Sequence, residues 1–231
     1  MGNKKNNSFE RPVLIPVRTV SIDYVNGIIA VPLNPKAFVI FVRANRASRQ
    51  KFIHNWVASV LRRQGWGTLL LDLLSPEEER SNNGKSLQFD LLTQRLNCVT
   101  DWALEQQDVG SIPIGYFAMS MAAATTLRSA AVLSSRIRAI VSAGGRPDLA
   151  CGLLGTVLAP TLLIVGGRDQ LALELNKEAF DEIKVEKQLI VIPEATHLFK
   201  EPGALTRVEH LATDWFKLHL EPSILVTAIT G

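Results

Sequence analysis

Three side chains of the types used in nucleophilic catalysis each come after a short apolar segment with the composition of a buried strand: Ser120, Asp169 and His197. In a serine, histidine and aspartate triad, the histidine deprotonates the serine, and the carboxylate orients the imidazole and stabilises its charged form. Ligands of parallel sheets bind beyond the carboxyl ends of the strands. We therefore predict that these three side chains meet at one edge of a sheet.

Each of the three residues also has a structural interpretation when it is taken alone. Ser120 and Asp169 both precede predicted helices, and serine and aspartate are common helix N-caps. A single loop histidine such as His197 is more often solvated or packed than catalytic. The order serine, acid, histidine, with 28 positions between the last two, favours catalysis because three separate structural roles would otherwise coincide. The remaining histidines lack matching partners and are predicted to be structural: His54, His210 and His219.

The residues around Ser120 predict a sharp turn from strand to helix, of the kind that exposes a nucleophile. Such a turn usually has glycine two residues before and two residues after the serine, because a Cβ atom crowds the strained backbone. Alanine stands at both positions here, Ala118 and Ala122, and adds the smallest side chain that carries a Cβ. The backbone N–H of Met121 is the predicted donor to an oxyanion at this turn.

The rest of the chain alternates apolar runs with amphipathic segments, which predicts a mostly parallel, doubly wound α/β sheet with helices on both faces. Two β-rich runs around an Asn-Gly pair, 17–22 and 27–31, predict an antiparallel N-terminal hairpin. The segment 75–86 is predicted to be a polar loop that partly covers the site. The predicted buried strands are 37–42, 68–71, 114–119, 139–142, 161–165 and 189–192, and the predicted helices include 52–61, 87–106, 121–133 and 205–218.

The chain resembles the α/β-hydrolase superfamily, and most of all the dienelactone-hydrolase-like small serine hydrolases. That group includes hydrolase-like domains found next to phosphoribosyltransferases or fused with them. The resemblance covers residues 11–220 and is most specific in PTLLIVGGRD (160–169) and ATHLF (195–199), with further matches at 69–79, 115–120 and 144–149. It implies an α/β-hydrolase fold in which Ser120 is the nucleophile, His197 the general base and Asp169 the orienting acid.

The loop after the third predicted strand, 37–42, departs from the pattern of these relatives. They usually have a His-Gly-Ser-Gly-like loop there, and its backbone donates the second hydrogen bond to the oxyanion. By resemblance that donor comes from Ala44 and Asn45, but the chain has Ala44-Asn45-Arg46-Ala47 in place of the glycines. Loss of one oxyanion donor lowers the rate by about 10²–10³. Two interpretations therefore stay open, a small serine hydrolase or a catalytically weakened α/β-hydrolase-fold protein that binds a small molecule or a protein partner.

Composition and charge narrow the function further. With 231 residues, 47% hydrophobic and 20% charged, the chain is predicted to form a basic flexible tail over 1–11 and one domain over 12–231. The net charge is +3, of which the first eleven residues supply +2, so the domain lacks the basic face of a nucleic-acid-binding protein. The arginines at 43, 46 and 49 are predicted to be solvated rather than to bind an anion.

Targeting, metal and cofactor motifs are also missing from the sequence. There is no secretory signal and no apolar run of about 18 residues, which predicts a cytoplasmic protein with no membrane partner. Neither metal-ligand spacing nor a phosphate-binding glycine motif is present, so no metal and no cofactor are predicted. Only eighteen residues separate the strands ending at Ser142 and starting at Thr161, which leaves no room for a cap domain. The prediction is a serine esterase that acts on an ester, thioester or lactone substrate; a flavodoxin-like binding module fits the triad order less well.

Overall fold

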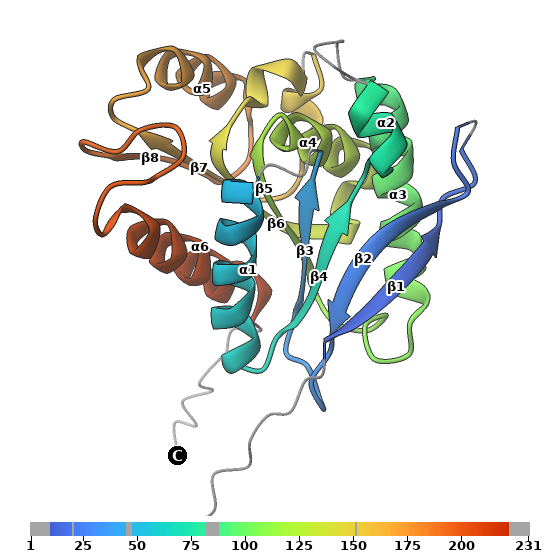
Figure 1. Ribbon diagram of the computed structural model, residues 1–231. Helices are drawn as coiled ribbons and strands as arrows, with labels where there is room; N and C mark the ends of the chain where they lie inside the picture. The colour runs from blue at the N-terminus through green and yellow to red at the C-terminus, as the bar shows by residue number, and fades with distance from the viewer. Residues whose placement is uncertain (1–9, 20, 45–47, 82–87, 151, 222–231) are drawn as a thin grey trace, which may run out of the picture.

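The computed structural model describes residues 10–19, 21–44, 48–81, 88–150 and 152–221, which form an α/β structure around one eight-stranded sheet (Figure 1). The strands lie in the order β1-β2-β4-β3-β5-β6-β7-β8. All neighbours are parallel except that β2 runs antiparallel to both β1 and β4, so the predicted sheet with an antiparallel hairpin is confirmed. The strands are β1 Arg11–Pro16, β2 Tyr24–Ala30, β3 Phe38–Arg43, β4 Gly67–Asp72, β5 Ile114–Ser120, β6 Ile137–Gly145, β7 Thr161–Gly166 and β8 Lys187–Ile192.

Helices cover both faces of this sheet (Figure 1). The α1 and α6 helices pack on one face, and α3, α4 and α5 pack on the other. Every residue of β3 is buried, as its continuous apolar run requires. Between β6 and β7 the described residues form short 3₁₀ segments and no cap domain. The helices are α1 Ser48–Arg63, α2 Pro76–Ser81, α3 Phe89–Glu105, α4 Ala122–Leu133, α5 Gln170–Glu182 and α6 Ala204–Leu220.

The first strand of the hairpin differs from its prediction. The predicted strand 17–22 is wrong, because its described residues form the turn that follows β1, in which the Val17 N–H donates to the Asp23 carbonyl at 2.8 Å. The true strand contains two prolines, Pro12 and Pro16, which argue against a strand in a sequence pattern. Proline is tolerated here because β1 lies at the edge of the sheet and pairs with β2 alone.

The predicted loop 75–86 contains the helix α2, and residues 82–87 lie outside the described part of the chain. The helix begins with a reciprocal capping pair. Ser75 Oγ accepts a hydrogen bond from the Glu78 N–H at 3.1 Å, and the Glu78 carboxylate accepts one from the Ser75 N–H at 2.9 Å. Serine followed by proline and then by glutamate at the third helical position is the sequence signal for this capping box. That signal identifies the helix where polarity alone suggested a loop.

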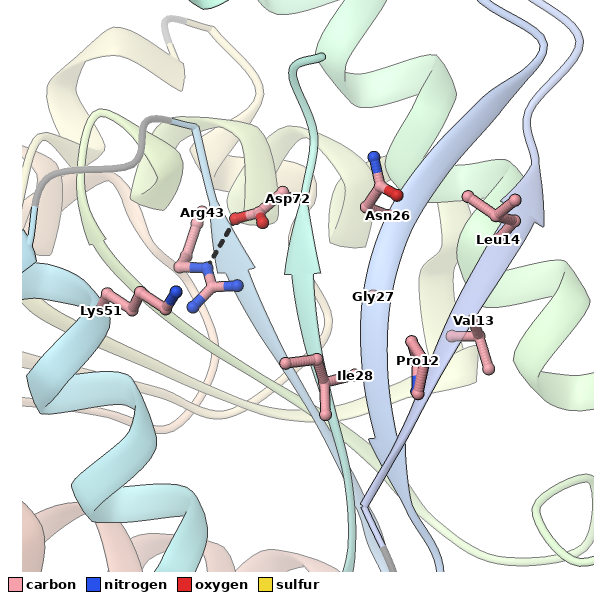
Figure 2. Close-up of a pocket in the computed structure, with 9 residues that line it drawn as sticks. All are labelled: Pro12, Val13, Leu14, Asn26, Gly27, Ile28, Arg43, Lys51 and Asp72. Carbon is pink, nitrogen blue, oxygen red and sulfur yellow. Dashed lines mark hydrogen bonds and ion pairs between the residues drawn. The ribbon is translucent and has the colours of Figure 1, made fainter. Parts of the chain in front are cut away.

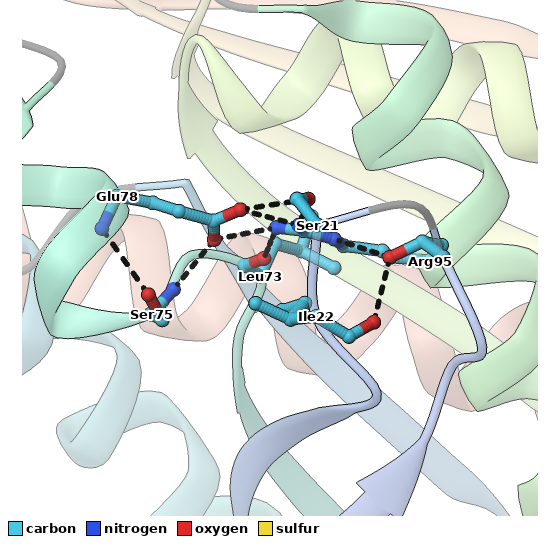
Figure 3. A network of polar contacts seen from close by, with 7 residues as sticks. Ser21, Ile22, Leu73, Ser75, Glu78 and Arg95 are labelled. Atoms are coloured by element: carbon cyan, nitrogen blue, oxygen red, sulfur yellow. Dashed lines mark hydrogen bonds and ion pairs between the residues drawn. The ribbon is translucent and has the colours of Figure 1, made fainter.

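Arg95 of α3 fixes α2 and the turn after β1 in place (Figure 3). Its guanidinium is fully buried, and each of its three nitrogens donates a hydrogen bond. The two terminal nitrogens reach the Glu78 carboxylate at 2.9 and 2.6 Å, the Leu73 carbonyl and the Ser21 hydroxyl, while Nε reaches Thr19 Oγ1. Burial alone would raise the pKa of Glu78, but these hydrogen bonds hold that pKa below its usual value.

His54 of α1 is a buried, neutral side chain between two phenylalanine rings. Its ring centroid lies 5.9 Å from that of Phe41 and 5.3 Å from that of Phe117, and neither ring nitrogen has a hydrogen-bond partner among the described residues. Burial lowers the pKa of His54 to about 3, and the charge of Arg43 contributes to the shift. His54 is therefore neutral in the folded core at neutral pH.

The burial of His54 predicts that the free energy of unfolding depends on pH. In the unfolded chain His54 takes up a proton near pH 6.5, and in the folded chain it does so only near pH 3, so the unfolded state is favoured as pH falls between these values. His54 should make the free energy of unfolding fall by up to about 1.4 kcal/mol for each pH unit of acidification in this range. Replacing His54 by leucine should remove this contribution. Urea unfolding from pH 7 to pH 4 measures the effect, with exposed His210→Gln as the control. Parallel slopes for His54→Leu and wild type would contradict the assignment.

Candidate active site

Ser120 occupies the sharp turn that its sequence predicts. Its φ angle is +51°, in the left-handed region that non-glycine residues rarely adopt, and the buried residues Ala118 and Ala122 flank it. The N-cap of α4 is Met121, so the interpretation of Ser120 as a helix N-cap is wrong. The Ser120 carbonyl accepts a hydrogen bond of 3.0 Å from the Arg146 N–H at the end of β6, which pins the turn to its neighbouring strand. A strained backbone held in this way is typical of functional positions.

Asp169 carries out both of the roles that its sequence position allows. One carboxylate oxygen caps α5 by accepting the Ala172 N–H at 3.2 Å. The other oxygen forms a hydrogen bond of 2.8 Å with Nδ1 of His197. The cap fixes the carboxylate at the start of a helix, so the histidine ring is oriented by a group that is itself held rigidly.

The backbone of the His197 loop approaches the ends of β6 and β7 very closely. A Cβ atom on Gly144 would lie 2.7 Å from the His197 carbonyl oxygen, and one on Gly166 would lie 2.4 Å from the Ala195 carbonyl oxygen. Gly144 also has a φ angle of +54°. Glycine is therefore required at both strand ends for the loop to reach Asp169.

Two charged side chains hold the same loop from outside. The Glu201 carboxylate accepts hydrogen bonds from the Thr196 N–H at 3.0 Å and from its hydroxyl at 2.7 Å. Arg49 of α1 donates to the Leu198 carbonyl at 3.3 Å and to the Phe199 carbonyl at 2.9 Å. The Arg49 contacts join residues about 150 positions apart, so no local sequence pattern predicts them.

The structure brings His197 and Asp169 into contact. It places Ser120 at the end of β5, two strands away from β7, and the described serine and histidine side chains are not hydrogen-bonded to each other. Ser120 pairs in register with Gly145, and the His197 ring packs against the neighbouring Gly144. His197 is 40% exposed and Ser120 is half-buried, so both side chains are accessible from the carboxyl edge of the sheet. Nucleophile and base are often farther apart in a ligand-free site than in the substrate complex.

The predicted oxyanion residues are only partly described. Met121 stands at the N-terminus of α4, and Ala44 is buried directly after β3. Asn45, together with Arg46 and Ala47, lies outside the described residues.

The prediction that the arginines of this region are solvated is wrong for the two that the structure describes. Arg43 is 4% exposed and donates from Nε to Asp72 at 2.7 Å, and Arg49 is half-buried against the His197 loop. Their partners are distant in sequence, so a local charge pattern does not reveal them.

Within the described part of the chain, no group of three histidine, cysteine or acidic side chains is arranged to hold a metal ion. The described helices include none that is both long and apolar enough to cross a bilayer.

The sheet order, the strained serine turn and the acid–histidine pair at the carboxyl edge define an α/β-hydrolase fold. A dienelactone hydrolase from Anabaena variabilis superimposes with a TM-score of 0.85 and 40% identity, over 92% of this chain and 99% of that one. The chain belongs to the dienelactone hydrolase family of α/β-hydrolases. The esterase Est1E from Butyrivibrio proteoclasticus has the same fold at 14% identity, with a TM-score of 0.71 over 89% of this chain and 98% of its own.

Curated relatives are also similar in sequence, although no family model matches the chain. Proteins of Mycobacterium tuberculosis strains H37Rv and CDC 1551 that bear the provisional name phosphoribosyl transferase are 50% identical over 196 residues. The match covers 85% of this chain but only 44% of those relatives.

The double role of Asp169 predicts two different effects on stability. Asp169→Ala removes the helix cap and should lower the free energy of unfolding by about 1 kcal/mol, whereas Asp169→Asn keeps a capping oxygen and should cost less than about 0.5 kcal/mol. Urea unfolding at pH 7 measures both values. Asp181→Ala, at an exposed position near the other end of α5, serves as the control. Equal losses in the alanine and asparagine variants would show that the cap contributes nothing.

Proposed function

We propose that the chain is a serine hydrolase that cleaves a small ester, thioester or lactone through an acyl-serine intermediate. The observation that carries this proposal is the 2.8 Å hydrogen bond between Asp169 and His197, at the sheet edge where Ser120 has its strained φ angle. A carboxylate that fixes one ring nitrogen of a histidine leaves the other nitrogen to act as a base.

In the first half of the reaction, His197 Nε2 accepts the hydroxyl proton of Ser120 as the serine oxygen bonds to the substrate carbonyl carbon. The bond from that carbon to the alcohol, thiol or ring oxygen then breaks, and the leaving group takes the proton from His197. In the second half, water gives a proton to His197 and attacks the acyl carbon. The Ser120 oxygen leaves and recovers the proton.

Negative charge develops on the substrate carbonyl oxygen in both halves. We assign the Met121 N–H as one donor to this oxygen, because the N-terminus of α4 adds the positive end of a helix dipole. The Ala44–Asn45 segment after β3 is the second donor in this proposal. The small residues Ala118 and Ala122 keep the turn open enough for the acyl group to approach Ser120.

The name of the mycobacterial relatives refers to proteins more than twice as long as the matched segment. We propose that the segment matched here is their hydrolase portion and that phosphoribosyl transfer belongs to the remainder. The support is that this chain covers 99% of a structure described as a dienelactone hydrolase.

Ser120→Ala tests the proposal directly. Wild type should react with a fluorophosphonate probe and hydrolyse 4-nitrophenyl butyrate, and the variant should lose labelling and at least ~10³-fold in kcat because no nucleophile remains. Ser59→Ala on α1 removes a hydroxyl away from the site and serves as the matched control.

An unlabelled wild type, beside a fully labelled serine hydrolase standard, would favour the binding-protein interpretation. Equal turnover by Ser120→Ala and wild type would assign the activity to another site.

A further inference from the structure

A cavity lies on the α1 side of the sheet, over β1, β2, β4 and the end of β3 (Figure 2). Its volume is about 700 Å³, within the range of small-molecule sites. None of the three candidate triad residues is among its described lining residues, so its ligand does not depend on the proposed hydrolase chemistry. The lining residues are Pro12, Val13, Leu14, Asn26, Gly27, Ile28, Arg43, Lys51 and Asp72.

The strand register divides the floor of this cavity into a polar row and an apolar row. Arg43, Asp72 and Asn26 are register partners across β3, β4 and β2, so their side chains lie in one line on the same face. This polar row ends at Leu14, the partner of Asn26 on β1. The row two residues away contains Ile28 of β2 opposite Pro12 of β1. The floor is therefore charged at the carboxyl edge of the sheet and apolar farther in, which suits an amphipathic ligand.

Arg43, which lines this cavity, has a buried terminal nitrogen that is an unsatisfied donor. It is 4% exposed, its Nε bonds to Asp72 at 2.7 Å, and its terminal nitrogen Nη1 has no hydrogen-bond partner in the described structure. Arg95, which is equally buried, donates from all three of its nitrogens. A buried guanidinium nitrogen left without a partner is costly, so Arg43 differs from an arginine with a purely structural role.

A second cation faces the same space. The Lys51 side chain extends from α1 toward the Arg43 guanidinium, whose terminal nitrogens point away from Asp72 (Figure 2). With Asp72 as the single described anion of the lining, the cavity carries a net charge of +1. That charge matches a monoanion. A flat carboxylate can also accept two parallel hydrogen bonds from the end of a guanidinium.

The walls of the cavity are held in place before any ligand binds. Arg62 of α1 donates from Nε to the Thr68 hydroxyl of β4 at 2.6 Å and pairs through Nη1 with Glu10, which precedes β1. Helix α1 is thus attached both to β4 and to the start of β1, two of the strands that form the floor. A preformed cavity of this kind avoids the cost of ordering on binding.

We propose that this cavity binds a small aliphatic or aromatic carboxylate. The carboxylate pairs with Arg43 and Lys51 at the carboxyl edge, and the apolar body covers Ile28 and Pro12. A dianionic phosphate is disfavoured because the cavity has a net charge of only +1 and contains Asp72.

Octanoate and its neutral match octanamide test the proposal by isothermal titration calorimetry. Octanoate should bind at least tenfold more tightly than octanamide, since the amide lacks the charge-assisted hydrogen bonds. Octanoate should also bind more tightly than acetate, which cannot cover the apolar row. Equal affinity for octanoate and octanamide, or displacement of octanoate by equimolar inorganic phosphate, would overturn the assignment.

Variants locate the binding. Two variants should each weaken octanoate binding about tenfold. Lys51→Gln removes a positive charge at an exposed position, and Asn26→Asp adds a negative charge to the polar row. Lys177→Gln on α5, which packs on the opposite face, makes the same charge change as Lys51→Gln and should leave affinity unchanged. Ser120→Ala should also bind normally, which separates this site from the candidate triad. If Lys51→Gln and Lys177→Gln behave alike, the proposal fails.

Discussion

The candidate site depends on the close backbone contact between the His197 loop and the ends of β6 and β7. A side chain on Gly144 or Gly166 would collide with a carbonyl oxygen of that loop at less than 3 Å. Such a collision would move His197 away from Asp169 and lengthen the 2.8 Å bond between them. The orientation of the histidine therefore depends on two positions that carry no functional group, and the contacts of Glu201 and Arg49 then hold the loop in place.

Much of this arrangement could be predicted from the sequence because it is encoded locally. Apolar runs predict the succession of strands and helices along the chain, and the residues that follow three of the strands identify Ser120, Asp169 and His197 as candidates. The two interpretations of Asp169 do not exclude each other, because a carboxylate has two oxygens and this one serves both a helix and a histidine. The φ angle of +51° at Ser120 identifies a strained turn, whereas the residue types around Ser120 are also compatible with a helix N-cap.

Most of the wrong predictions lie where contacts between distant residues override local sequence patterns. Prolines at 12 and 16 obscured β1, and only its place at the edge of the sheet makes them acceptable. Polarity suggested a loop at 75–86, although the capping pair of Ser75 and Glu78 was readable in the sequence. Arginines expected at the surface are buried because their partners lie far along the chain, as with Arg43 and Asp72.

The two buried arginines Arg95 and Arg43 have different roles because their guanidinium groups differ in hydrogen bonding. The guanidinium of Arg95 is saturated by Glu78, Leu73 and their neighbours, so it fixes elements and leaves nothing for a ligand. That of Arg43 is neutralised by Asp72 through Nε, and its Nη1 has no hydrogen-bond partner among the described residues. A ligand that supplies an acceptor would recover the desolvation cost of that nitrogen, so in the proposed site the burial of this cation favours anions. The carboxyl edge of this sheet thus offers two separate chemical environments, one built around a strained serine and the other around an under-coordinated arginine.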